Sequence, residues 1–279
     1  MILREHEAGI GSRGGFTLVE LSIVLVILGL LVGGVLAGQS LIHAAELRAI
    51  SNEYTSYKVA IGAFREKYMG LPGDITNATA FWGTEGVGSG HVEGPCDISG
   101  AVDTATCNGD GNGIVTGSGS AIIGLADYHE NFRAWEQMAN AGLIDGTYSG
   151  TSIYDDPDAG EIIHATPGVN TPRSRFSGAG WTIIAQPPAN GSASYFAAPY
   201  KGITLMFGGP RVGGPNLLLP MGVMKPEDAY SFDRKLDDGL PQSGSVMSMK
   251  NINCLEATYD AYKVSSTTNG CTLLLLSGF

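Results

Sequence analysis

Charged side chains are scarce in this chain, and basic ones are scarcer than acidic ones. Asp, Glu, Lys and Arg make up 15% of 279 residues, and 16 basic residues stand against 27 acidic ones, which gives a formal net charge of −11. Because an acidic surface repels polyanions, this balance argues against non-specific binding to nucleic acid, and we expect no nucleic-acid partner. Gly is abundant instead, at 41 residues, so we expect many turns and loops.

Signatures of common enzymes are also missing. The sequence holds no G-x-S-x-G and no C-x-x-C, and its five His lack the spacing of metal ligands. The acidic pair Asp237-Asp238 fits a helix end before Gly239, and the acidic residues around Pro157 fit a solvated turn. Nothing in these patterns argues for catalysis, so we predict that the protein is not an enzyme.

One long uncharged run lies near the N-terminus. It follows Gly14-Gly15, Phe16 and the single carboxylate of Glu20, and it covers residues 21–45. A transmembrane helix needs about 20 predominantly apolar residues, so the run is long enough to cross a bilayer. A carboxylate at membrane depth is costly and requires a partner. Two other interpretations stay open, a secretory signal cleaved after Ala37 and a plain N-terminal anchor.

The stretch Gly15-Phe16-Thr17-Leu18-Val19-Glu20 resembles the processing site of type IV prepilins and of the related pseudopilins of type II secretion. The resemblance implies that a prepilin peptidase cleaves between Gly15 and Phe16 and methylates the new amino group of Phe16. It also implies that Glu20 neutralises the Phe16 amine of a neighbouring subunit during assembly. Physically, an ammonium beside the carboxylate would offset much of its cost in an apolar filament core.

The same resemblance implies partners and a location. The partners are other copies or other pilins in a filament, the prepilin peptidase, an inner-membrane assembly platform and the membrane itself. The precursor would lie in the inner membrane with its head in the periplasm. After assembly the subunit would belong to an extracellular filament or a periplasmic pseudopilus.

A narrow apolar stripe continues the first helix beyond the uncharged run. Its members recur at alternating spacings of three and four residues: Leu47, Ile50, Tyr54, Tyr57, Ile61, Phe64 and Tyr68. This spacing predicts an amphipathic helix with one face docked on a domain, and Lys58 lies off that face. Gly70-Leu71-Pro72-Gly73 would end the helix. A coiled-coil partner for the stripe is the alternative.

The predicted fold class is α+β, with a long N-terminal helix packed on a head that contains an antiparallel sheet, as in pilins. We expect a leader at 1–15, the helix at 16–69 and the head at 70–279, with a Gly-rich loop at 74–120. A second amphipathic helix would carry Leu125, Tyr128, Phe132, Trp135 and Met138 and end at Gly142. A short helix would begin at Lys225-Pro226 and close at Asp237 to Gly239. Short apolar runs predict strands at Glu161–Ala165, Trp181–Ala185, Gly202–Phe207, Asn216–Leu219 and Leu273–Leu276.

The four cysteines follow an export signal, which favours two disulfides. Three pairings are open, and sequence proximity favours Cys96–Cys107 and Cys254–Cys271. The second pair resembles the C-terminal disulfide loop of many type IV pilins. Each would stabilise the head by about 3 kcal/mol in the chain-entropy model.

A candidate calcium loop lies beside the first cysteine pair. Oxygen-bearing side chains alternate at Asn108, Asp110 and Asn112, and Gly113 follows for a sharp turn. The bidentate Glu of a full loop is missing, so further ligands would have to come from elsewhere, such as Asp97 or Asp103. A tight Asn/Gly turn without an ion is the other interpretation.

The sequence as a whole therefore predicts a structural subunit, major or minor, of a type IV pilus-like filament. A pseudopilin of a type II secretion system is the first alternative. A membrane-anchored periplasmic binding protein that does not polymerise is the second.

Overall fold

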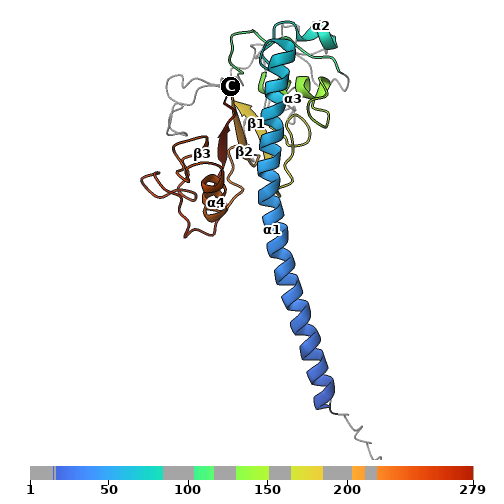
Figure 1. The fold of residues 1–279 in the computed structure, drawn as a ribbon, viewed down its shortest axis with the longest axis vertical. Helices are drawn as coiled ribbons and strands as arrows, with labels where there is room; N and C mark the ends of the chain where they lie inside the picture. The colour runs from blue at the N-terminus through green and yellow to red at the C-terminus, as the bar shows by residue number, and fades with distance from the viewer. Residues whose placement is uncertain are drawn as a thin grey trace, which may run out of the picture. The chain divides into compact units, whose positions relative to one another are not determined.

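The structure is a computed structural model that describes residue 15 and residues 17–83, 104–115, 130–150, 165–184, 203–210 and 219–278. Within these ranges the elements follow in the order shown in Figure 1: α1 (Leu18–Tyr68), α2 (Ala78–Trp82), α3 (Glu130–Asn140), β1 (Gly180–Ile184), β2 (Thr204–Gly208), α4 (Pro226–Leu236), β3 (Val246–Ser248) and β4 (Leu273–Leu276). A long N-terminal helix followed by an antiparallel sheet with helices confirms the predicted α+β class.

The chain forms two compact units, and the division falls inside α1. The first unit is Met1–Ala45 and the second is Glu46–Phe279. The second unit thus includes the amphipathic part of α1, which the predicted boundary at residues 69 and 70 had separated from the head. The leader at 1–14 lies outside the described residues.

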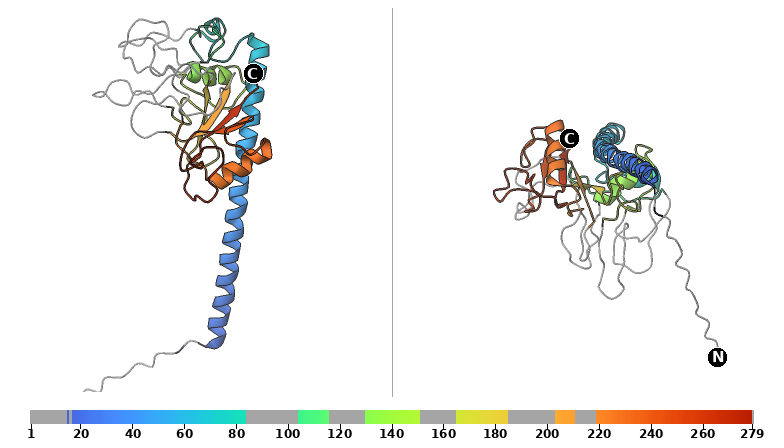
Figure 2. Two further views of the ribbon diagram at one scale, coloured as in Figure 1. Left: turned by 90° about the vertical axis from the view of Figure 1, so that its left-hand side faces the viewer. Right: turned by 90° about the horizontal axis from the view of Figure 1, so that it is seen from below.

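The sheet of the second unit has four antiparallel strands in the order β1-β2-β4-β3 (Figure 2). Trp181 pairs with Phe207 across β1 and β2, and Met206 pairs with Leu274 across β2 and β4. Val246 of β3 pairs with Leu275 of β4. Because side chains alternate between the two faces of a strand, these registers place the apolar residues of the sheet on its two opposite faces.

The apolar residues on one face of the sheet form the main core together with the stripe of α1. Ile50, Ile61 and Phe64 are buried in it, and Leu47, Tyr54, Tyr57 and Tyr68 pack against it from partly buried positions. The sheet contributes Trp181, Ile183, Leu205, Phe207, Val246, Leu273 and Leu275 to the same core. The stripe is therefore covered within its own chain, as the docking prediction required, so a coiled-coil partner is not needed to bury it.

Two polar residues of α1 add directional contacts to this apolar face. The Glu53 carboxylate accepts hydrogen bonds from Trp181 Nε1 (2.8 Å), from Ser174 Oγ (2.6 Å) and from the backbone N–H of Arg175 (2.8 Å). The Tyr54 hydroxyl donates to the carbonyl oxygen of Leu276 at the end of β4 (2.6 Å). Because these bonds have fixed directions, they select one rotation of α1 against β1 and β4.

Several predicted elements are confirmed, with shifts of one or two residues at their ends. β1, β2 and β4 correspond to the expected strands at Trp181–Ala185, Gly202–Phe207 and Leu273–Leu276, and α4 corresponds to the short helix after Lys225. α3 corresponds to the second amphipathic helix, although Leu125 and Tyr128 lie outside the described residues. The expected strands at Glu161–Ala165 and Asn216–Leu219 also lie outside them, apart from their last residues, which are not in strands.

Two short elements were not predicted. α2 lies inside the segment 74–120, which the sequence indicated only as a loop, and β3 has three residues. Both are too short to carry a recognisable period, and their formation depends on neighbours that are distant in sequence.

The C-terminal disulfide is present between Cys254 and Cys271, whose Cα atoms are 4.8 Å apart. The disulfide closes the segment that leads into β4. The backbone of Cys271 also forms an isolated antiparallel β-bridge with that of Met224, just before α4. Cys107 is buried, but Cys96 lies outside the described residues, so the Cys96–Cys107 pairing stays a prediction.

Candidate functional site

The N-terminus of α1 is closed by a reciprocal pair of side chains. The Glu20 carboxylate oxygen Oε2 accepts hydrogen bonds from the backbone N–H and the hydroxyl of Thr17, each at 2.8 Å. In return the backbone N–H of Glu20 donates to Thr17 Oγ1 at 3.2 Å. This is a capping box, in which the residue before the helix and the third helical residue satisfy each other's exposed backbone groups. Sequence reasoning singled out Glu20 but missed its local partner, although the Thr-x-x-Glu spacing was available.

The part of α1 that follows is apolar and exposed. Side chains such as Leu25 and Val26 expose 61% and 71% of their surface. Among the described residues α1 is long and apolar enough to cross a membrane, and no part of its most apolar 18-residue stretch is buried. An exposed apolar surface of this size is suited to contact with lipid or with other apolar helices. Gly15 is exposed, and Phe16 lies outside the described residues.

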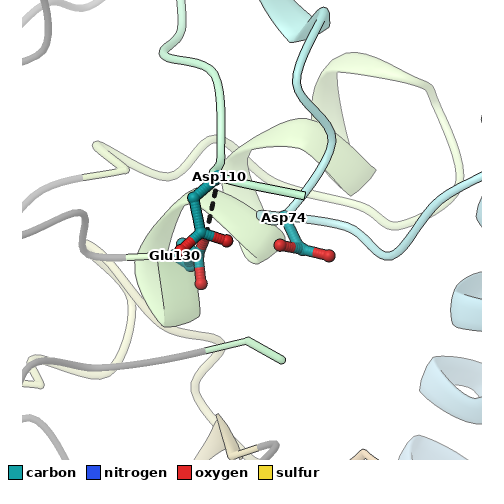
Figure 3. A group of neighbouring side chains, drawn as sticks. All are labelled: Asp74, Asp110 and Glu130. Atoms are coloured by element: carbon teal, nitrogen blue, oxygen red, sulfur yellow. Dashed lines mark hydrogen bonds between the residues drawn. The ribbon is translucent and has the colours of Figure 1, made fainter. Parts of the chain in front are cut away.

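A second candidate site lies in the head, where three carboxylates meet. Figure 3 shows Asp74, Asp110 and Glu130 directed toward one another, and one oxygen of each lies within 4.8 Å of the others. Asp74 and Glu130 expose only 4% and 1% of their surface, whereas Asp110 is exposed. The backbone N–H of Asp110 donates to Glu130 Oε1 at 3.2 Å. Oxygen ligands of this kind suit a hard divalent cation such as Ca²⁺.

Close backbone packing positions Asp74 in this cluster. Gly73 has φ of +88°, and a Cβ at this position would collide with the carbonyl oxygen of Glu130, so only glycine fits. Gln137 of α3 accepts from the Gly73 N–H (2.7 Å) and donates to the carbonyl oxygen of Cys107 (3.0 Å). The side chain of Gln137 thus holds together the segment that carries Asp74 and the segment that carries Asp110.

The Asp74 carboxylate also holds the turn that the sequence singled out. It accepts from the backbone N–H groups of Asn112 (3.1 Å) and Gly113 (3.0 Å). Burial raises the pKa of Asp74, and the neighbouring Asp110 raises it further, while these two bonds lower it. Folding therefore places Asp74 where a negative charge is costly, and a bound cation would relieve that cost.

The three predicted ligands occupy different positions around the cluster. Asp110 belongs to it, while Asn112 Nδ2 donates to Asp110 Oδ2 at 2.6 Å. Asn108 is directed elsewhere, because its Oδ1 accepts from the Thr79 N–H at the start of α2. Sequence reasoning missed Asp74 and Glu130, which no local spacing connects to Asp110. The suggested extra ligands Asp97 and Asp103 lie outside the described residues.

A second acidic group, Asp233, Asp237 and Asp238, lies at the end of α4. The Asp233 carboxylate is buried and accepts from the Tyr262 hydroxyl (2.8 Å) and the Gly239 N–H (3.1 Å). Asp237 accepts from the N–H groups of Ser245 and Val246, at the start of β3. These bonds connect the helix end to β3 and to the disulfide segment, which agrees with the predicted helix end rather than with a ligand site.

Burial of Asp233 makes the stability of the head depend on pH. Burial raises its pKa to about 6 from 3.8, although the Tyr262 bond lowers it. Folding therefore favours the protonated form, so the contribution of Asp233 is fully present below about pH 3.8 and is lost as pH rises through about 6. We expect the free energy of unfolding of the wild-type head to fall between pH 4 and pH 7 relative to Asp233→Asn, measured by urea denaturation. Exposed Asp260→Asn is the control, and parallel curves for wild type and Asp233→Asn would contradict this assignment.

Comparison with known protein families identifies a motif in the N-terminal segment. Residues 11–36 match the family model for the prokaryotic N-terminal methylation motif. No curated protein and no solved structure matches the chain. The match covers the segment from before the predicted cleavage site into the exposed half of α1. The motif and the long apolar helix together indicate a type IV pilin-like or pseudopilin protein, a class of generally non-enzymatic structural proteins.

Proposed function

We propose that the protein is a structural subunit, a major or minor pilin, of a type IV pilus-like filament. The observation that carries the proposal is the methylation motif at residues 11–36, which extends into the exposed apolar part of α1. In this proposal a prepilin peptidase cleaves before Phe16 and methylates its amine. The subunit then waits in the inner membrane until an assembly platform transfers it into the filament.

Each part of α1 has a distinct role in this mechanism. The apolar half exchanges lipid for the helices of other subunits, so its exposed surface stays in an apolar environment throughout. Glu20 pairs with the amine of a neighbouring Phe16, which compensates both charges in the filament core. The amphipathic half is fixed in the head by its buried stripe and by the bonds of Glu53, so a pull on the helix is transmitted to the head.

Two alternatives use the same N-terminal segment differently. A pseudopilin would assemble into a short periplasmic filament of a type II secretion system, and an anchored binding protein would not assemble. The test is to shear cells that express the protein and to examine the released fraction by immunogold electron microscopy. Labelled extracellular filaments support the pilin proposal, and their label density separates a major from a minor subunit. Protein found only in the membrane fraction of wild-type cells would contradict it.

We also propose that calcium binds at the carboxylates of Asp74, Asp110 and Glu130 and stabilises the surrounding loop. The proposal rests on the approach of their oxygens to within 4.8 Å and on the buried position of two of them. Asn112 is the other predicted ligand beside the cluster, whereas Asn108 would have to release the Thr79 N–H to join it.

Chelation should then lower the melting temperature of a soluble head that lacks residues 1–43, because a ligand of the folded state adds stability by mass action. At calcium 100-fold above its dissociation constant the gain is about 2.7 kcal/mol. Asp110→Asn should remove the difference between calcium and chelator, whereas Asp260→Asn should retain it. If the wild-type head melts at the same temperature with and without chelator, the segment is a tight turn without a bound ion and the calcium proposal is wrong.

A further inference from the structure

An exposed asparagine just before α2 lies in the sequence pattern of an N-glycosylation acceptor. The pattern Asn-x-Ser/Thr occurs at residues 77–79 and at residues 190–192, and the second occurrence lies outside the described residues. At the first, the middle residue is Ala78, and any residue except proline fits there. Because an acceptor has to lie at the surface of an exported segment, the fold decides whether this pattern is usable.

The side chain of Asn77 is exposed and unengaged. Within the described part of the chain its carboxamide makes no hydrogen bond. An Asn that directly precedes a helix normally accepts a bond from the N–H two or three residues further on. Here the Thr79 N–H donates instead to Asn108 Oδ1, at 2.9 Å. Asn108 thus supplies the bond that Asn77 would otherwise make, so a modification of Asn77 leaves the start of α2 intact.

Thr79, the third residue of the pattern, is held through its backbone. Its N–H donates to Asn108, and its carbonyl oxygen accepts from the Gly83 N–H at 2.9 Å. Among the described residues its hydroxyl has no hydrogen-bond partner. A transferase can therefore bind this hydroxyl while it orients the neighbouring carboxamide, without breaking a bond of the fold.

An exposed aromatic ring lies one helical turn from Asn77. Phe81 exposes 51% of its surface, and residues four apart on a helix are neighbours on its surface. The ring packs against Tyr68 and Trp82, with centroid distances of 4.9 Å and 5.6 Å, so it is held in place while part of it stays open. A pyranose has an apolar face of C–H groups. A sugar on Asn77 would cover the open part of Phe81, which is favourable because it removes apolar surface from water.

We propose that Asn77 is an N-glycosylation site whose glycan lies over Phe81. In the transfer step Asn77 Nδ2 forms a bond to the anomeric carbon of a saccharide that is carried as a lipid-linked pyrophosphate. The bond from that carbon to the pyrophosphate oxygen breaks, the lipid pyrophosphate leaves with the bonding electrons, and a base of the transferase takes one amide proton. This inference rests on the proposed function in one respect, that the head is exported from the cytoplasm.

Peptide mass spectrometry of the full-length protein from the cells that naturally make it tests the modification. Trypsin cleaves after Lys67 and next after Arg133, so Asn77 lies in the peptide 68–133. We expect this peptide to carry the added mass of at least one monosaccharide. Fragmentation that preserves the bond to the sugar should locate the added mass on Asn77. A wild-type peptide with unmodified Asn77 would overturn the proposal.

Variants distinguish Asn77 from the hydroxyl groups beside it. Asn77→Gln and Thr79→Ala should each abolish the added mass, because one moves the carboxamide and the other removes the hydroxyl of the pattern. Thr79→Ser should retain it. Thr76→Ala is the matched control and should also retain it, since Thr76 is exposed next to the pattern but is not part of it. A sugar that persists in Asn77→Gln, or that is lost in Thr76→Ala, would overturn the proposal.

Hydroxyl-radical footprinting tests where the glycan lies. Oxidation of Phe81 should be lower in the glycosylated wild type than in Asn77→Gln. Oxidation of Val264, which is equally exposed at 51%, should be the same in both proteins. Equal oxidation of Phe81 in the two proteins would overturn the placement of the glycan over its ring.

The same digest separates failure of this inference from failure of the proposed function, because its N-terminal peptide shows where the mature chain begins. A chain that begins at Phe16 and carries an unmodified Asn77 would overturn this inference alone. A chain that begins at Met1 and carries a modified Asn77 would support this inference and contradict the proposed function.

Discussion

Glu20→Ala is expected to abolish filament formation while leaving membrane insertion and cleavage intact. The substitution removes the carboxylate, so the ammonium of a neighbouring Phe16 would enter an apolar core without a partner. Breaking a buried ion pair by removing one member costs about 3–5 kcal/mol at each contact. Because a filament repeats the contact in every subunit, assembly should fall below detection in sheared-cell fractions.

Ser22→Ala is the matched control for Glu20→Ala. Ser22 lies two residues away on the same exposed helix. Among the described residues its hydroxyl donates to the carbonyl oxygen of Val19 in its own first turn. Its loss should leave the filament yield near wild type. Glu20→Gln retains the length of the side chain but not the charge, so it should fail as Glu20→Ala does. A normal filament yield from Glu20→Ala would show that Glu20 is not the pairing group.

Phe64→Ala is expected to destabilise the head by about 3–5 kcal/mol, the usual range for truncating a buried Phe. Phe64 is fully buried, and its ring centroid lies 4.6 Å from that of Tyr68 and 6.3 Å from that of Trp82. The substitution would therefore leave a cavity in the main core. Chemical denaturation of a soluble head that lacks residues 1–43 measures the loss.

Ser56→Ala is the control for Phe64→Ala, because Ser56 is exposed on the same helix and should change the free energy of unfolding by no more than about 0.5 kcal/mol. Lys58 lies off the stripe but is partly buried, so it is a poorer control than its position in the sequence suggested. Equal small losses from Phe64→Ala and Ser56→Ala would mean that the stripe is not docked on the head in solution.

The parts of the fold that could be predicted from sequence are those whose signal is local. The apolar residues from Leu47 to Tyr68 recur with a helical period, so both the helix and its docked face could be predicted from the sequence. The run of four leucines at 273–276 is short, apolar and preceded by Cys271, and it forms β4. The Gly15-to-Glu20 motif is equally local, and it led to the same class of protein as the family match at residues 11–36.

The remaining features depend on residues that approach only in the folded chain. Asp74, Asp110 and Glu130 come from three separate segments, which the Gly73 turn and Gln137 bring together. Glu53 is not a member of the apolar stripe, so the helical period does not single it out, yet it accepts three hydrogen bonds around β1. β3 forms because Val246 and Met247 pair with β4, and its three residues alone do not predict a strand.

The N-terminal mass of the protein recovered from cells shows whether the prepilin-type processing site is used. We expect the mature chain to begin at Phe16 and its amino group to carry a methyl group. Cleavage after Ala37, which would give a chain that begins at Gly38, would instead establish a secretory signal. Either that result or an unprocessed chain beginning at Met1 would contradict the assignment of a pilin-like subunit.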